Sequence, residues 1–227
     1  MVKTIVGSFD DSRAAHRAAQ GLIDDGFMQQ DISVVASNIL GDYTPDGRPL
    51  LTDEVPESEA ETGAVAGGVL GGAAGLTASL VGLAIPGLGP IVAVGPLIAM
   101  LTGAGAGAVA GGLIGALTRS GVPEEHAGYY AETVRRGGAI VSIRADESRA
   151  ERAAEILRAN GAIDLDERVV RWRDRGWRGW DSAAKPFTAD EAERERRLYG
   201  AHADPLSGLP LTNDPEGENR QASTIRR

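Results

Sequence analysis

The chain has 227 residues, no cysteine and a formal net charge of −9 at pH 7. The lack of cysteine excludes a disulfide framework, thiolate chemistry and a zinc–thiolate site, and the acidic balance argues against general nucleic-acid binding. The placement of glycine therefore carries more information about function than the overall composition does.

Residues 1–40 have the pattern of one βαβ half of a domain. Apolar periodicity and capping residues predict a strand, a helix, a glycine stop and a second strand. These are, in order, Ile5 to Phe9, Asp11 to Ala19, Gly26 and Ile32 to Val35. The chain runs from Met1 directly into a strand pattern, so we expect no signal peptide.

An acidic linker, residues 41–61, leads into a segment, 62–118, that has no charged side chain between Thr62 and Thr118. Glycine recurs there at every fourth position in two runs. The runs are Gly63, Gly67, Gly71 and Gly75, and then Gly103, Gly107, Gly111 and Gly115. On a helix this spacing places the glycines along one face, where another backbone can approach closely. The pattern is a paired glycine zipper.

Glycine inside a helix costs about 1 kcal/mol relative to alanine, so these helices need compensation from a bilayer or from a close protein interface. Residues 63–84 and 97–118 would each span about 33 Å, close to a hydrocarbon core. Between them, Pro86, Gly87, Gly89 and Pro90 favour reversal. We therefore predict a helical hairpin over residues 62–118.

The arginines near the hairpin base place that base in the cytoplasm, since the predicted tip has no lysine or arginine. This favours an inner-membrane-associated protein with a cytoplasmic domain, the alternative being a cytoplasmic one. The partners expected are membrane lipid and further copies of the chain.

Residues 119–170 repeat the pattern of the first half. A bridging helix over Pro123 to Arg136 with a stop at Gly137-Gly138 is followed by a second βαβ pattern. Its parts are a strand at Ile140 to Ile143, a helix at Glu147 to Ala154, Gly161, and a strand at Ile163 to Val169. Two such halves predict an α+β fold, a ferredoxin-like split βαβ sheet interrupted by the hairpin.

Residues 171–200 form a Trp/Arg-rich extension that holds all the tryptophan of the chain, Trp172, Trp177 and Trp180. These side chains are candidate interface anchors, at a membrane surface, on the sheet, or in a subunit contact. A short helix is expected over Asp190 to Tyr199, and residues 201–227 have the composition of a disordered tail.

The order of three blocks resembles the bacterial general stress proteins, a family with heat-induced and low-temperature-induced members. The blocks are Ile5 to Val35, the Gly-rich middle with its Ile85 to Pro90 turn, and Val122 through Val141. The resemblance covers about residues 1 to 170. It implies a stress-associated protein and supplies no catalytic residues.

No catalytic, metal or cofactor motif stands out. His16, His126 and His202 lie in separate segments without ligand spacing. The glycines of residues 103–108 match a dinucleotide fingerprint, but no strand pattern precedes them and the four-residue repeat explains them better. We expect a non-catalytic protein without metal or cofactor.

Three functions remain open at this point. The first is a stress protein that inserts its hairpin into a membrane and self-assembles through the glycine faces. The second is a soluble homo-oligomer with the hairpins buried at its centre. The third is a regulatory module whose sheet binds a small ligand, which rests on fold analogy.

Overall fold

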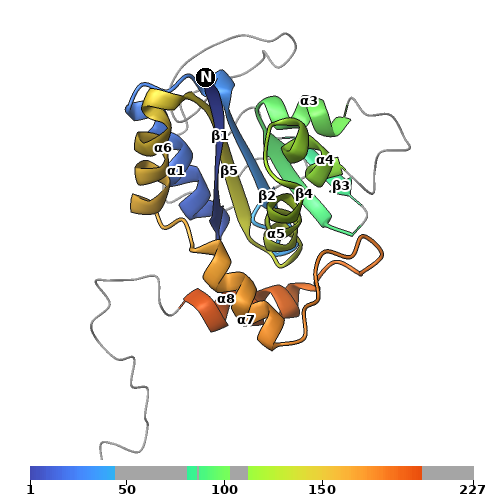
Figure 1. Ribbon diagram of the computed structural model, residues 1–227. Coiled ribbons are helices and arrows are strands. Elements are labelled where there is room, and N and C mark those ends of the chain that lie inside the picture. The colour runs from blue at the N-terminus through green and yellow to red at the C-terminus, as the bar shows by residue number, and fades with distance from the viewer. Residues whose placement is uncertain (44–80, 86, 103–111, 201–227) are drawn as a thin grey trace, which may run out of the picture.

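The computed structural model describes residues 1–43, 81–85, 87–102 and 112–200. It shows an α+β fold built on a five-stranded sheet, in which every strand pair is antiparallel. Helices cover both faces of this sheet, and two further helices lie across one end of it (Figure 1). The predicted α+β class is confirmed.

The first βαβ half forms as the sequence predicts. It consists of β1 (Val2–Phe9), α1 (Ser12–Asp24), a 3₁₀ turn η1 (Gln29–Asp31) and β2 (Ile32–Ser37). The side chain of Asp11 caps α1 by accepting a hydrogen bond from the Ala14 N–H at 2.8 Å.

The second half forms only in part. β5 (Ala139–Asp146) and α6 (Glu147–Ala159) are present as predicted, but the strand expected over Ile163 to Val169 is wrong. Only Ile163 bridges to Ser8 of β1, and the chain then enters the helix α7 (Leu165–Asp174). The reason is local, because Asp164 caps this helix by accepting from the Glu167 N–H.

Two further strands, β3 (Val81–Ile85) and β4 (Gly89–Val94), complete the sheet, whose strand order is β1-β5-β2-β4-β3. The strand β5 therefore lies between the two strands of the first half. Its register sets Ile143 beside Ile5 on one side and beside Ile32 on the other. Among the described residues the predicted four-stranded arrangement therefore lacks its fourth strand. The antiparallel pair of strands β4 and β3 extends the sheet beyond β2 instead.

The helical hairpin predicted over residues 62–118 is wrong in its central part. Residues expected at the helix ends and tip form two strands, β3 (Val81–Ile85) and β4 (Gly89–Val94), and β4 pairs with β2. Pairing with β2 lets the apolar side chains of β4 alternate between the two faces of the sheet, where Ile91 and Val92 are buried. In the predicted helical hairpin the same residues would not be buried on both faces of a sheet.

The second face of the sheet carries three helices, α3 (Pro96–Thr102), α4 (Gly112–Arg119) and α5 (Glu124–Arg135). The helix α5 matches the predicted bridging helix. The predicted helix 97–118 is represented by α3 and the main part of α4, and residues 103–111 between them lie outside the described residues.

Two apolar cores result, one on each face of the sheet. The first joins α1 and α6 to the sheet around Phe9, Leu22 and Val141. The second joins α3, α4 and α5 to the sheet around Ile91, Leu117 and Ile140. Among the described residues no helix combines the length and apolar content that crossing a bilayer requires.

The extension contains α7 and α8 (Ala189–Gly200) and packs across the lower end of the domain in Figure 1. The expected short helix at Asp190 to Tyr199 is thus present. The acidic linker beyond residue 43, the first glycine run and the predicted tail 201–227 lie outside the described residues.

Candidate functional site

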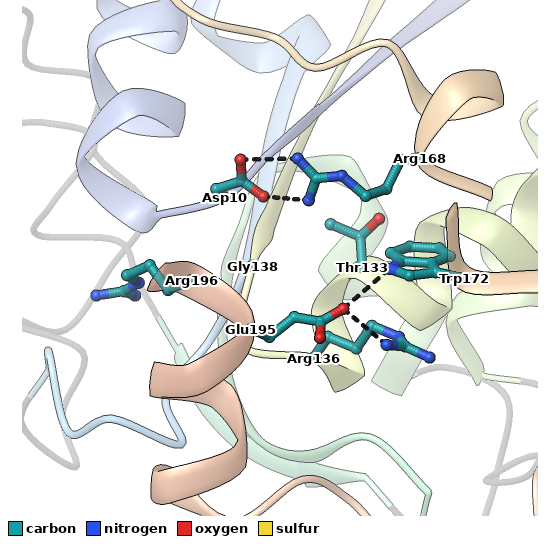
Figure 2. Close-up of a pocket in the computed structure, with 8 residues that line it drawn as sticks. All are labelled: Asp10, Thr133, Arg136, Gly138, Arg168, Trp172, Glu195 and Arg196. Atoms are coloured by element: carbon teal, nitrogen blue, oxygen red, sulfur yellow. Dashed lines mark hydrogen bonds and ion pairs between the residues drawn. The ribbon is translucent and has the colours of Figure 1, made fainter. Parts of the chain in front are cut away.

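A group of charged side chains lies where the end of β1, α5, α7 and α8 meet (Figure 2). We call it the junction cluster. Its lining residues are Asp10, Thr133, Arg136, Gly138, Arg168, Trp172, Glu195 and Arg196. Four segments of the chain supply these residues, so the cluster exists only in the folded protein.

The centre of the ion pairing is Glu132 of α5, which is fully buried. Its carboxylate accepts from Arg136 Nε at 2.6 Å and also forms an ion pair with Arg135, both on the same helix. A buried carboxylate needs such partners, because leaving water costs an unpaired charge several kcal/mol.

Arg136 connects α5 to the extension. Its Nη1 donates to Glu195 Oε1 of α8 at 2.7 Å, and the same oxygen accepts from Trp172 Nε1 of α7 at 3.0 Å (Figure 2). The Arg136 guanidinium also lies over the Trp172 ring, 4.7 Å from its centroid. One arginine thereby holds three helices together.

A second ion pair fixes α7 to the end of β1. The Arg168 guanidinium donates to both carboxylate oxygens of Asp10, at 2.5 and 3.0 Å, in the two-pronged geometry that arginine favours (Figure 2). It also lies 3.7 Å from the centroid of the Tyr199 ring, which connects it to α8.

The enclosed space at the junction cluster is small. Its volume is about 10 Å³, which holds about one water molecule. The charged groups are paired with one another, and this leaves no room for a metabolite among them. The arrangement therefore joins the extension to the domain.

The three tryptophans, predicted as interface anchors, pack against the protein itself. Trp172 is almost fully buried within the chain. Trp177 contacts the rings of Trp172 and Tyr129 edge to face at 5.6 and 5.8 Å. Trp180 packs with its Cβ close to Gly128 of α5. The interpretation in which the extension packs on the domain describes this geometry.

A smaller polar cluster lies beside α1. His16 Nδ1 donates to the Ser12 carbonyl at 2.8 Å, which leaves Nε2 unprotonated and buried without a partner. Burial lowers the pKa of His16, and the hydrogen bond to Ser12 only partly opposes this. The neighbouring Tyr43 hydroxyl lies 3.1 Å from Nδ1, and burial raises its pKa to about 12. Both groups are therefore neutral at pH 7.

The remaining hollows are shallow and lined by charges of both signs. One of them, about 480 Å³, lies between α5 and the extension, with Glu124, Glu125, Arg173 and Arg178 around Trp180. Tyr129 donates to Glu125 at its edge, and this hydrogen bond lowers the pKa of the Glu125 carboxyl. Among the residues with assigned structure, no group of histidine and carboxylate side chains has the makings of a metal site.

The structure places only Gly115 of the eight zipper glycines, in the middle of α4. A Cβ on Gly115 would meet only Arg119 Nη1 at 3.5 Å, an ordinary contact. Within the part of the chain that the structure describes, no backbone approaches this glycine closely. The other seven, Gly63, Gly67, Gly71, Gly75, Gly103, Gly107 and Gly111, lie outside the described residues.

The predicted turn residues do reverse the chain, but between strands. The Leu88 N–H donates to the Ile85 carbonyl at 3.0 Å, and Gly87 has φ +80°. This φ suits glycine at the third position of a tight turn. Gly89 and Pro90 belong to β4, and Pro86 lies outside the described residues.

Sequence reasoning missed Glu132, Arg136 and Glu195. The spacing of Glu132 and Arg136 by four residues on a predicted helix was a signal for their ion pair, but such pairs are usually on solvated faces. The link from Arg136 to Glu195 spans 59 residues, and no local pattern reveals it.

Comparison with known proteins adds no relative. No model of a known protein family matches the chain, no curated protein matches it, and no solved structure matches its fold. The functional argument therefore depends on the geometry and on the sequence itself.

Proposed function

We propose that this chain is a non-catalytic, stress-associated protein that self-assembles through its two Gly-rich segments, with the α+β domain as a platform. The observation that carries the proposal is where the described chain enters and leaves those segments. The stress association comes from the resemblance of the sequence blocks alone.

Both Gly-rich segments attach around one short helix, α3. Val81, which follows the first segment, pairs with Ala93 just before α3 begins. The second segment joins the end of α3 to α4, where the Leu101 side chain lies 3.6 Å from a Cβ built on Gly112. A helix of seven residues is about 10 Å long. The described ends of the chain that flank the two Gly-rich segments therefore lie near the same helix.

The surroundings of Gly115 support assembly between protomers. Glycine in a helix is unfavourable unless close packing compensates, and none of the described residues brings its backbone close to Gly115. A glycine face from a second copy would supply that contact.

A membrane setting is the second candidate, favoured by the absence of charge between Thr62 and Thr118. In this version the Gly-rich segments associate within or against lipid, and the sheet domain stays in the cytoplasm. The hairpin tip cannot reach the far side of a bilayer, since residues 89–94 belong to the sheet.

The ligand-sensing alternative is weaker. It rests on the ferredoxin-like arrangement, which we propose for the centre of the sheet because β1-β5-β2 with α1 and α6 has three strands in that order. The enclosed junction cavity holds about one water molecule, so among the described residues this cavity does not support a ligand site.

The test changes Gly67, Gly71, Gly107 and Gly111 together to leucine in the full chain and measures mass by light scattering after size exclusion. We expect the wild type above its protomer mass of 23.6 kDa and the variant at that mass, because leucine blocks a close helix contact. The same four changes to alanine are the control and should keep the assembly.

Unchanged assembly in the leucine variant would contradict the proposal. Carbonate and detergent extraction of cell membranes then separates the two settings. Release by detergent alone supports the membrane version, and recovery in the cytosol supports a soluble assembly.

A further inference from the structure

The two outer edges of the sheet differ in how they are protected, and this difference points to a contact between copies. The edges are formed by β1 and β3, which lie on opposite sides of the sheet in Figure 1. An unprotected edge strand presents free backbone groups that another strand can pair with.

The edge at β1 is occupied or charged. The Ser8 carbonyl accepts from the Ile163 N–H at 2.8 Å, and the Val6 carbonyl accepts from the Tyr130 hydroxyl at 3.2 Å. Near the start of the strand, Lys3 adds a charged, exposed side chain, which disfavours pairing with another chain.

The edge at β3 has none of these features. Its sequence, VGLAI, contains no charge and no proline, and no described residue pairs with its outer side. Both Gly82 and Ala84 are exposed, whereas Leu83 and Ile85 pack toward the second core.

The direction of the free groups follows from the register. The Pro90 carbonyl accepts from the Asn38 N–H at 2.8 Å, so the backbone of Pro90 faces β2. Because Ala84 is opposite Pro90 in an antiparallel pair, its N–H and carbonyl point away from β4. The same holds for Gly82, two residues earlier. The edge thus presents two donors and two acceptors.

We propose that this edge pairs with the β3 edge of a second copy, antiparallel about Leu83. In that register Gly82 of one copy faces Ala84 of the other, and all eight outward groups form four hydrogen bonds. The outward donors and acceptors are spaced symmetrically about Leu83, so the edge matches a second copy of itself. Because the strand has no charged side chain, it offers nothing that would select a charged partner instead. The pairing continues the sheet across a two-fold axis.

This inference rests on the proposed self-assembly. A five-residue strand buries much less than the roughly 800 Å² per partner of a stable interface, so the edge contact needs help. The first Gly-rich segment precedes β3 directly, and its association would bring the two edges together. The edge contact then sets the register of the assembly.

The test exploits the absence of cysteine from the chain. In the proposed register the two Leu83 residues form a non-hydrogen-bonded pair with Cα atoms about 4.5 Å apart, which suits a disulfide. Full-length Leu83→Cys is oxidised and run on a non-reducing gel. The control is Ala84→Cys, whose two Cα atoms would be more than about 7 Å apart, beyond disulfide reach.

We expect at least about fivefold more cross-linked dimer from Leu83→Cys than from Ala84→Cys. A second variant, Ala84→Lys, leaves the core untouched and should raise the monomer fraction severalfold, since an edge lysine opposes pairing. Its control is Val170→Lys at an exposed position of α7, which should leave assembly unchanged.

The outcomes separate the two proposals. An assembled wild type in which Leu83→Cys cross-links no more than Ala84→Cys, and Ala84→Lys has no effect, overturns the edge contact and leaves the Gly-rich assembly standing. A wild type that stays monomeric at all concentrations overturns both.

Discussion

Two carboxylates, one on each face of the sheet, each bind two arginines, and their surroundings differ sharply. On the α1 face, Asp25 pairs with Arg149 and Arg152, whose side chains are 41% and 56% exposed. On the α5 face, Glu132 is fully buried, with Arg135 and Arg136 only 6% and 14% exposed.

The difference in burial means that the two groups of ion pairs contribute differently to the stability of the fold. Water and salt screen the Asp25 pairs, so they add little to stability. The buried Glu132 group is costly to disturb, because losing one partner leaves a charge without water or counterion. Both faces have an apolar core, but only on the α5 face do buried charges add substantially to it.

The change with the largest expected effect is Glu132→Gln. It leaves Arg135 without its buried counterion, and we expect the free energy of unfolding to fall by about 3–5 kcal/mol. Urea denaturation followed by circular dichroism measures the loss. Glu124→Gln, on the exposed side of the same helix, is the control and should be close to neutral. If Glu132→Gln lowers the free energy of unfolding no more than Glu124→Gln does, the buried ion pairs on the α5 face matter no more than solvated ones, and the contrast with the α1 face does not hold.

Next in size is Arg168→Gln, which removes the two-pronged contact with Asp10. Hydrogen bonds to charged groups contribute about 1.5–3 kcal/mol, and we expect the loss to appear first in the extension. All tryptophan of the chain lies in residues 172–180, so tryptophan emission reports on that region alone. Emission should shift to longer wavelength at a lower urea concentration than the circular dichroism change. Coincident transitions would show that the extension and the domain unfold together.

A pH-dependent effect is expected from His16, a half-buried titratable group on the α1 face. Its folded pKa lies below the unfolded value near 6.5, so the unfolded chain binds the proton more readily. The stability from the neutral ring is present above pH 6.5 and is lost as the pH falls toward the folded pKa. The loss is at most about 1.4 kcal/mol per pH unit.

The variant His16→Asn tests this, since its amide can still donate to the Ser12 carbonyl. The difference in unfolding free energy between wild type and variant should shrink between pH 7.5 and 5. A difference that stays constant over this range would show that His16 does not take up its proton on unfolding.

The smallest effect is expected for Asp25→Asn. The hydrogen bond from Arg152 holds the pKa of Asp25 below its usual value, but both partners are solvated. We expect a slight destabilisation in dilute buffer that disappears in concentrated salt. Thermal unfolding at two salt concentrations measures it. A salt-independent loss would mean that the Asp25 pairs behave like the buried group on the other face.

The sequence predicts the two halves of the sheet well, because their signals are local. Apolar periodicity identifies β1, β2 and β5, and glycine stops follow the helices at Gly26, Gly137 and Gly161. All three glycines adopt positive φ, from 86° to 97°, as a helix C-terminus often requires.

The strands β3 and β4 were not predicted, because the four-residue glycine repeat favours helix over the whole of residues 62–118. What decides their structure is pairing of β4 with β2, more than 50 residues earlier in the chain. The run Ile91 to Val94, rich in β-branched side chains, was the only local signal for a strand. For α7, Asp164 followed by Glu167 was a capping signal that the apolar Val169 and Val170 concealed.

The candidate site was less predictable than the fold. The tryptophans stood out by composition, but their buried contacts depend on the path of the extension. Glu132 gains its importance from burial, and burial is a property of the assembled tertiary structure.

The position of β5 has a consequence for synthesis of the chain on the ribosome. This strand fills the middle of the sheet, yet it ends only at Asp146. Until it has been made, β1 and β2 have no strand between them, and about a hundred residues separate β2 from its missing neighbour. The first βαβ half cannot form its final core early, and sheets closed by distant segments fold slowly. The nascent chain therefore exposes the inner edges of β1 and β2 for as long as translation of the middle segment lasts.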